Sequence, residues 1–284
     1  MSSLSAQYPS KTLRVSNLVS YALLIAVNVA SNSGLLGPTN AEISQKYTTP
    51  LTPSGWAFSI WGVIFALEGL GVIYAAMPQG YNETGWKERT VNAIGYSWQA
   101  CWLFECLWQL LFLWQLPVGM VACLVCLLGA LASMLYALSR LYAVKRSNGA
   151  SNVPSSLLYV VFFLPTSINA AWLSVASGLG VLIVPLSYGH TAHLQAVAAV
   201  IAAVAIAAGV LTLQREQDIA YGVTLVWSLI AIYYKQWPIS VIRIVSLSGL
   251  AVLTIFIVVA IIQRLRQRKY SPANSSDLEE SLQG

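Results

Sequence analysis

Charged side chains are the scarcest part of this sequence. Lysine, arginine, aspartate and glutamate make up 9% of its 284 residues, against roughly 25% in soluble proteins. Hydrophobic residues make up 57%. A soluble domain of this length could not bury so much apolar surface behind so few charges. The composition therefore excludes an ordinary soluble protein and predicts an integral membrane protein that crosses the bilayer several times.

The sequence also has few cysteines and none of the common catalytic motifs. A free cysteine in a membrane span behaves as a small hydrophobic residue, and no disulfide framework is expected. The sequence contains no P-loop, G-x-G-x-x-G, H-E-x-x-H or Ser-His-Asp pattern. It therefore predicts no enzyme, no metal centre and no bound cofactor. The four cysteines all lie within two expected spans: Cys101, Cys106, Cys123 and Cys126.

Long apolar runs occupy most of the chain. A helix needs roughly 20 apolar residues to cross a bilayer, and we expect eight such spans. Because the runs are continuously apolar and do not alternate, the predicted fold is all-α rather than a β-barrel. The fold class is a polytopic membrane helix bundle of about eight transmembrane helices. The expected spans are 17–36, 55–76, 96–116, 119–139, 156–177, 193–213, 219–235 and 239–262.

The basic residues set the expected orientation. With eight spans, twelve of the 15 lysines and arginines share one side with both ends of the chain, so both termini are expected in the cytoplasm. This distribution accounts for the net charge of +5, and no nucleic-acid partner is expected. The predicted organisation is a cytoplasmic segment at 1–16, one membrane domain at 17–262, and a basic, then disordered, tail at 263–284.

Two expected spans carry a carboxylate among aromatic residues. In the second span, Trp61, Phe65 and Glu68 share one helical face, because residues three and four apart lie on the same side. A carboxylate within the bilayer is costly and usually faces protein or water. Glu68 is therefore a candidate functional residue, although a hydrogen bond that only joins two helices would also explain it.

The third expected span shows the same pattern more strongly. Its polar and aromatic stripe is expected to face the interior of the bundle or a cavity, where Glu105 could meet Glu68. For the tryptophans, ordinary packing is an equal alternative to lining a site. The stripe consists of Trp98, Trp102, Glu105, Gln109 and Phe112.

The fifth expected span contains a proline in its interior. Pro165 removes a helical hydrogen bond and is expected to kink the helix. Asn169 and Trp172 follow on the same face, so the kink could open a pocket that these side chains line. The alternative is that Thr166 and Ser167 accommodate the proline without a pocket.

Several segments resemble one family. Thr52–Phe65 (T-P-S-G-W-A-F-S-I-W-G-V-I-F), the W-x-x-x-W pair of the third span and Leu164–Ala176 (L-P-T-S-I-N-A-A-W-L-S-V-A) are similar to segments of the TspO/MBR tryptophan-rich sensory proteins. Val226–Gln236 is similar to a segment of the longer, eight-helix branch. The resemblance implies a five-helix part at 17–180 and three additional helices at 181–262.

The resemblance also implies a function. Members of the family have an intramembrane pocket for hydrophobic ligands such as porphyrins or sterols, with roles in transport or sensing. By motif, three residues would line the entrance of that pocket and three would form its walls. The entrance residues are Trp56, Phe58 and Trp61, and the wall residues are Trp98, Trp102 and Trp172.

The sequence leaves three alternative functions open. The first is binding of a hydrophobic molecule, of tetrapyrrole or sterol class, in a Trp- and Glu-lined pocket. The second is proton-coupled secondary transport through Glu68 or Glu105, and the third is a non-catalytic membrane scaffold. The expected partners are the lipid bilayer and a hydrophobic small molecule, with a homo-oligomer as an open alternative.

Overall fold

The structure, a computed structural model, describes residues 8–79, 81, 85–147 and 156–269, and all regular elements in these ranges are helical. The predicted all-α class is therefore confirmed. The elements are α1 (Lys11–Asn32), α2 (Asn40–Lys46), the 3₁₀ turn η1 (Gly55–Ser59), α3 (Ile60–Ala76), α4 (Trp86–Ile94), α5 (Ser97–Phe112), α6 (Pro117–Ser147), α7 (Ser156–Leu158), the π turn η2 (Tyr159–Phe163), α8 (Leu164–Ser187), α9 (Leu194–Glu216), α10 (Ile219–Lys235) and α11 (Ser240–Lys269).

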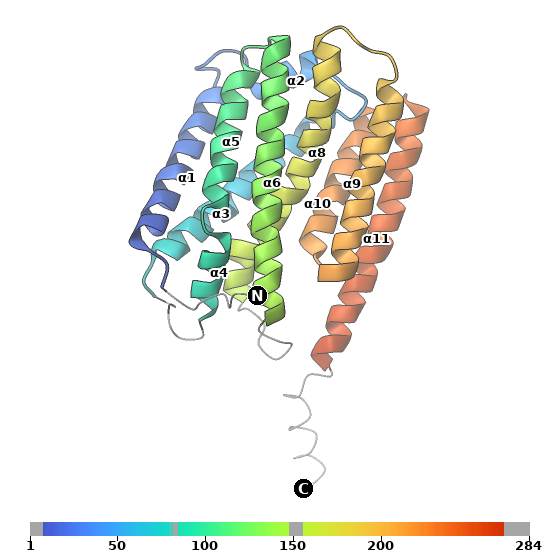
Figure 1. The fold of residues 1–284 in the computed structure, drawn as a ribbon. Helices are drawn as coiled ribbons and strands as arrows, with labels where there is room; N and C mark the ends of the chain where they lie inside the picture. The colour runs from blue at the N-terminus through green and yellow to red at the C-terminus, as the bar shows by residue number, and fades with distance from the viewer. Residues whose placement is uncertain (1–7, 80, 82–84, 148–155, 270–284) are drawn as a thin grey trace.

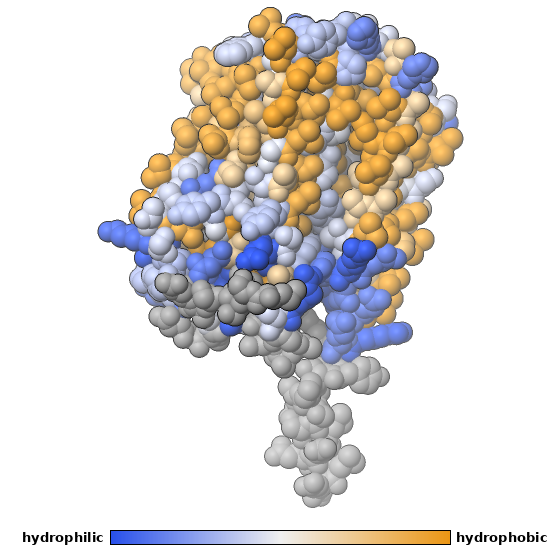
Figure 2. All heavy atoms as spheres, in the orientation of Figure 1, coloured by the Kyte–Doolittle hydropathy of each residue, from blue (hydrophilic) through white to orange (hydrophobic). Residues whose placement is uncertain are grey.

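The long helices run side by side as one bundle (Figure 1). Within the described ranges, six helical segments are long and apolar enough to cross a membrane, and α10 is a shorter apolar helix. The start of α1 and the end of α11 lie at the same end of the bundle (Figure 1). Hydrophobic residues cover the visible flank, and hydrophilic residues gather at that end (Figure 2). The count of eight spans and the cytoplasmic location of the termini stay predictions.

Several helix ends differ from the expected spans. α1 begins at Lys11 rather than 17, because the Ser10 side chain caps the helix by accepting a hydrogen bond from Leu13 N. α8 continues ten residues past 177, to Ser187. Gly178 does not end α8 but lets Ile201 of α9 approach closely, since an added Cβ would lie 2.6 Å from that side chain. The predicted tail beyond residue 269 lies outside the described residues.

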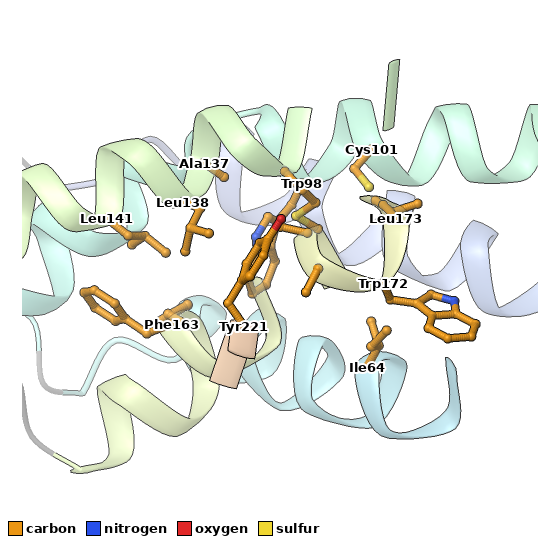
Figure 3. Packing of buried hydrophobic residues seen from close by; sticks show 14 of the residues in the cluster. Ile64, Trp98, Cys101, Ala137, Leu138, Leu141, Phe163, Trp172, Leu173 and Tyr221 are labelled. Carbon is orange, nitrogen blue, oxygen red and sulfur yellow. The ribbon is translucent and has the colours of Figure 1, made fainter. Parts of the chain in front are cut away.

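The helices form two connected groups. α6 packs between α5 and α8, and α1 packs on α5 and α3. α9, α10 and α11 pack on one another and join the first group mainly through α8. One hydrophobic core crosses the boundary, since Tyr221 of α10 belongs to the same buried cluster as Trp98 and Leu138 (Figure 3).

Pro165 produces a local change in helix type rather than a break. The π turn η2 immediately precedes α8, and the Thr166 hydroxyl donates to the Phe162 carbonyl at 2.6 Å. Gly71 of α3 packs directly on the Val161 carbonyl, which an added Cβ would approach to 2.3 Å. Val161 is four residues before Pro165, so its carbonyl is the one that the missing N–H would have bonded. A glycine thus lets α3 lie against the irregular part of the fifth span.

A buried carboxylate joins the two helix groups near the end where α11 finishes. Asp218, at the N-cap of α10, accepts from Tyr221 N at 3.1 Å. Its other oxygen accepts from Tyr142 of α6 and Ser167 of α8, each at 2.6 Å. Because the three donors come from three helices, Asp218 fixes α10 against α6 and α8. Arg146 of α6 also pairs with Glu216 of α9.

Candidate functional site

The first helix group encloses a cavity of about 330 Å³. Its lining residues come from α1, α2, η1, α3, α5, α6 and α8, and none comes from α9, α10 or α11. Most of the lining is apolar, but a group of polar side chains also faces it. The polar lining residues are Asn28, Asn32, Asn40, Ser44, Glu105 and Gln109.

Aromatic rings from four elements form one wall of the cavity. Trp61 of α3 lies edge-on to Trp172 of α8, with ring centroids 6.3 Å apart, and is stacked near Trp108 of α5 at 6.5 Å. Phe58 of η1 also meets Trp172 edge-on, at 5.8 Å. Edge-to-face and offset contacts at these distances are the favourable geometries for aromatic pairs. The wall therefore presents several ring faces and edges to an apolar molecule.

The two predicted carboxylates meet through one amide. Asn169 Nδ2 donates to Glu68 Oε1 at 2.9 Å and to Glu105 Oε1 at 3.3 Å. Trp102 Nε1 donates to the second oxygen of Glu68 at 2.8 Å, and Cys101 Sγ contacts Glu105 Oε1 at 3.4 Å. Glu68 and Glu105 are 0% and 2% exposed. The pair is thus buried between α3, α5 and α8 with neutral donors around it.

The predicted site residues fall into three groups. Four line the cavity: Phe58, Trp61, Glu105 and Trp172. Four are buried but outside the lining: Glu68, Trp98, Trp102 and Asn169. Trp56 is 45% exposed and lies away from the cavity, where its ring contacts Trp227 of α10 at 4.6 Å. The structure therefore moves Trp56 from the expected pocket entrance to the contact with the additional helices.

The stripe of the third span is buried as predicted, with all five of its residues at 3% exposure or less. Trp98 and Trp102 take part in packing and hydrogen bonding: Trp98 Nε1 donates to Thr166 Oγ1 at 3.1 Å. Further down the stripe, Glu105, Gln109 and Phe112 reach the cavity. One stripe thus supplies both a structural layer and part of the cavity wall.

Residues of α1 and α2 also line the cavity, which was not predicted from the sequence. Asn28 and Asn32 of α1, with Asn40 and Ser44 of α2, line the cavity, and α2 lies at the end of the bundle opposite the chain ends (Figure 1). The signal for α2 was present, because Thr39 and Glu42 form a capping box. The three asparagines could have been noted as amides in or beside an apolar span.

The segment that brings Phe58 and Trp61 to the cavity is held by α10. Gln236 Nε2 donates to the carbonyls of Thr49 and Thr52, at 3.1 and 2.7 Å. Both N and Oγ of Ser54 donate to the Ala231 carbonyl. Trp227 Nε1 donates to the Ala57 carbonyl at 3.2 Å. The additional helices do not line the cavity, but they fix the segment that does.

Comparison with protein families gives one match. The family model described as TSPO-like protein matches residues 14–259, which is most of the chain. The chain belongs to the TSPO-like protein family. Neither the search of curated proteins nor the search of solved structures found a match.

As a TSPO-like protein with six candidate spans, the chain is an integral, multi-pass membrane protein. The family match runs from α1 into α11, so it covers the three later helices as well as the part that encloses the cavity. The part of this TSPO-like protein that the structure describes holds no group of three or more His, Cys, Asp or Glu side chains that could bind a metal ion.

Proposed function

We propose that this TSPO-like protein binds a hydrophobic small molecule in the cavity between α3, α5, α6 and α8. Tetrapyrroles and sterols are the ligand classes that the family suggests, in a sensing or transport role. The observation that carries the proposal is the aromatic-walled cavity itself. Its volume of about 330 Å³ lies at the lower end of the range for small-molecule sites, roughly 300–1,000 Å³.

The composition of the wall supports an apolar ligand with some polar character. Ligand sites are mostly apolar with a few placed polar groups. Here Trp61, Trp172 and Phe58 supply the rings, Met120 and Leu127 of α6 supply aliphatic surface, and Glu105 is one of the polar groups. The arrangement differs from a merely packed core, in which side chains would fill this volume.

The proposal is tested by filling the cavity without damaging the fold. Gly62 lines the cavity and an added Cβ there meets nothing within 4 Å, so Gly62→Leu has open space at its first side-chain atom. Ala176→Leu adds volume to the cavity lining from α8. Ala203→Leu, an exposed position on α9, is the matched control.

We expect a porphyrin added to detergent-solubilised protein to quench tryptophan fluorescence saturably in the wild type and the Ala203 control. The two cavity variants should lose at least about 90% of the affinity, which corresponds to 1.4 kcal/mol. Equal affinity in all four proteins, each with an unchanged melting temperature, would show that the ligand binds elsewhere.

Proton-coupled transport is the second candidate, favoured by the bridged Glu68–Asn169–Glu105 arrangement. Two carboxylates this close repel when both are charged, and among the described residues no cationic side chain bonds to either of them. A proton shared by the pair would remove that repulsion. Uptake of a ligand into proteoliposomes should then depend on a pH gradient in the wild type and lose that dependence in Glu68→Gln. Uptake that ignores the gradient in the wild type would exclude this candidate.

A further inference from the structure

Two neighbouring polar atoms of the cavity wall lack a hydrogen-bond partner. Glu105 Oε2 and Gln109 Nε2 are both buried and unpartnered, and both residues line the cavity. They lie four residues apart on α5, one turn from each other on the same face. Buried polar groups are nearly always satisfied, and each exception requires an explanation. The pair offers one acceptor and one donor with no hydrogen bond between them.

Two other buried polar atoms of the cavity lining, Asn40 Oδ1 and Trp172 Nε1, also lack a partner, but they lie on α2 and α8, whereas Glu105 and Gln109 share one face of α5. Gln109 Oε1 accepts from Asn28 Nδ2 at 3.3 Å, and Asn28 Oδ1 accepts from Asn32 Nδ2 at 3.0 Å. Glu105 Oε1 accepts from Asn169. These bonds orient the Gln109 amide, because its oxygen is bound on one side and its NH₂ group is left on the other. This orientation makes Gln109 Nε2 the donor and Glu105 Oε2 the acceptor of the unfilled gap between the two side chains.

We infer that this gap is a subsite for a hydroxyl group of the ligand. A hydroxyl can accept one hydrogen bond and donate another at the same time. It would accept from Gln109 Nε2 and donate to Glu105 Oε2, satisfying both atoms. An ether or a ketone oxygen could only accept, and a hydrocarbon could do neither. The inference rests on the proposed function and narrows its ligand to an apolar, ring-containing alcohol or phenol.

The neighbouring rings fit this ligand class. Trp61, Trp108 and Trp172 line the same cavity as the polar pair, so a ring system bound among them can direct a hydroxyl toward α5. Both polar atoms are shielded from solvent in the structure. Their terminal side-chain torsions are soft, and a small rotation of each brings it to the hydroxyl. The subsite therefore forms when the ligand enters.

Three naphthalenes of similar size test the inference with the full-length protein in detergent. 1-Naphthol donates and accepts, 1-methoxynaphthalene only accepts, and naphthalene does neither. Dissociation constants are measured by tryptophan quenching for the wild type, Gln109→Met and Glu105→Gln. For each protein, the dissociation constant of one probe is divided by that of another. Comparing this ratio between proteins cancels the partitioning of each probe into micelles. Met120→Leu, an apolar change in the same cavity, is the control.

We expect the preference of the wild type for naphthol over methoxynaphthalene to fall about tenfold in Glu105→Gln, because only naphthol can donate to Glu105 and a hydrogen bond to a buried group is worth about that factor. In Gln109→Met, naphthol and methoxynaphthalene should each lose about tenfold in affinity relative to naphthalene, because both accept from Gln109 and naphthalene does not. Each variant remains informative where the other does not fold, and Met120→Leu should leave both ratios unchanged.

Two results would overturn the inference in different ways. If Glu105→Gln leaves the naphthol-to-methoxynaphthalene ratio unchanged and Gln109→Met leaves the ratio of either probe to naphthalene unchanged, no hydroxyl subsite exists, while the cavity itself would stand. Saturable binding of none of the three probes, together with porphyrin quenching that the cavity-filling variants do not alter, would remove the proposed function and the subsite together.

Discussion

Replacing Gln236 with leucine should release the segment that carries Phe58 and Trp61. Gln236 is 6% exposed, and its amide donates to two carbonyls of the segment, those of Thr49 and Thr52. Leucine has a similar size and no donor. The substitution therefore removes both hydrogen bonds and leaves two carbonyl oxygens in a buried place that water reaches poorly.

The expected size of the effect follows from the two bonds. Each net hydrogen bond contributes about 1 kcal/mol, and an unsatisfied buried carbonyl adds to the loss. We therefore expect local opening of residues 49–59 to become easier by about 2 kcal/mol, or roughly 30-fold. The bonds from Ser54 and Trp227 remain, so the loss should be local rather than global.

Amide hydrogen exchange followed by mass spectrometry measures this opening directly. Peptides covering 49–59 should exchange about 30-fold faster in Gln236→Leu, whereas peptides from α6 should be unchanged. Gln263→Leu, which removes an exposed glutamine from α11, is the matched control. Unchanged exchange in 49–59, or an equal increase in every peptide, would refute the role of α10 as the support of this segment.

The remaining predictions concern packing and the joint between the helix groups, and thermal unfolding in detergent measures each. Gly71→Ala should destabilise the protein by about 2 kcal/mol because its Cβ would collide with the Val161 carbonyl. Gly62→Ala, with open space around it, should be neutral or slightly stabilising. Equal changes in stability for the two variants would contradict the close contact between Gly71 and η2. Asp218→Ala should cost about 3 kcal/mol, since it removes a helix cap and two buried hydrogen bonds. Tyr142→Phe should cost about 1 kcal/mol, and an equal loss in both variants would show that neither the Asp218 cap nor its bond from Ser167 contributes.

The long helices could be predicted because each depends on a local property of the sequence. Apolar runs of the right length identify α6 and α9 without knowledge of their partners. The stripe of α5 predicted its buried face because helical spacing alone determines which residues share a side. The ends were less predictable, since Ser10 capping and the glycine contacts of α8 depend on single side chains and neighbouring helices.

The site was only partly predictable because its composition depends on which faces meet. The cost of burying a carboxylate drew attention to Glu68 and Glu105, but only packing shows that Asn169 bridges them and that Glu105 alone of the two lines the cavity. Trp56 carries the same sequence signal as Trp61, yet the 3₁₀ turn directs it toward α10. Contacts between segments distant in sequence therefore decide which of two similar side chains lines the cavity.

Photolabelling can show directly whether a ligand binds in the cavity within the bundle. A hydrophobic diazirine probe is bound to the purified protein, irradiated, and located by peptide mass spectrometry with and without excess unlabelled ligand. We predict competed labels on Trp61, Phe112 and Ala176, which come from three helices but one cavity. Labels confined to exposed residues such as Val204 and Ile255, with no competition, would contradict the account.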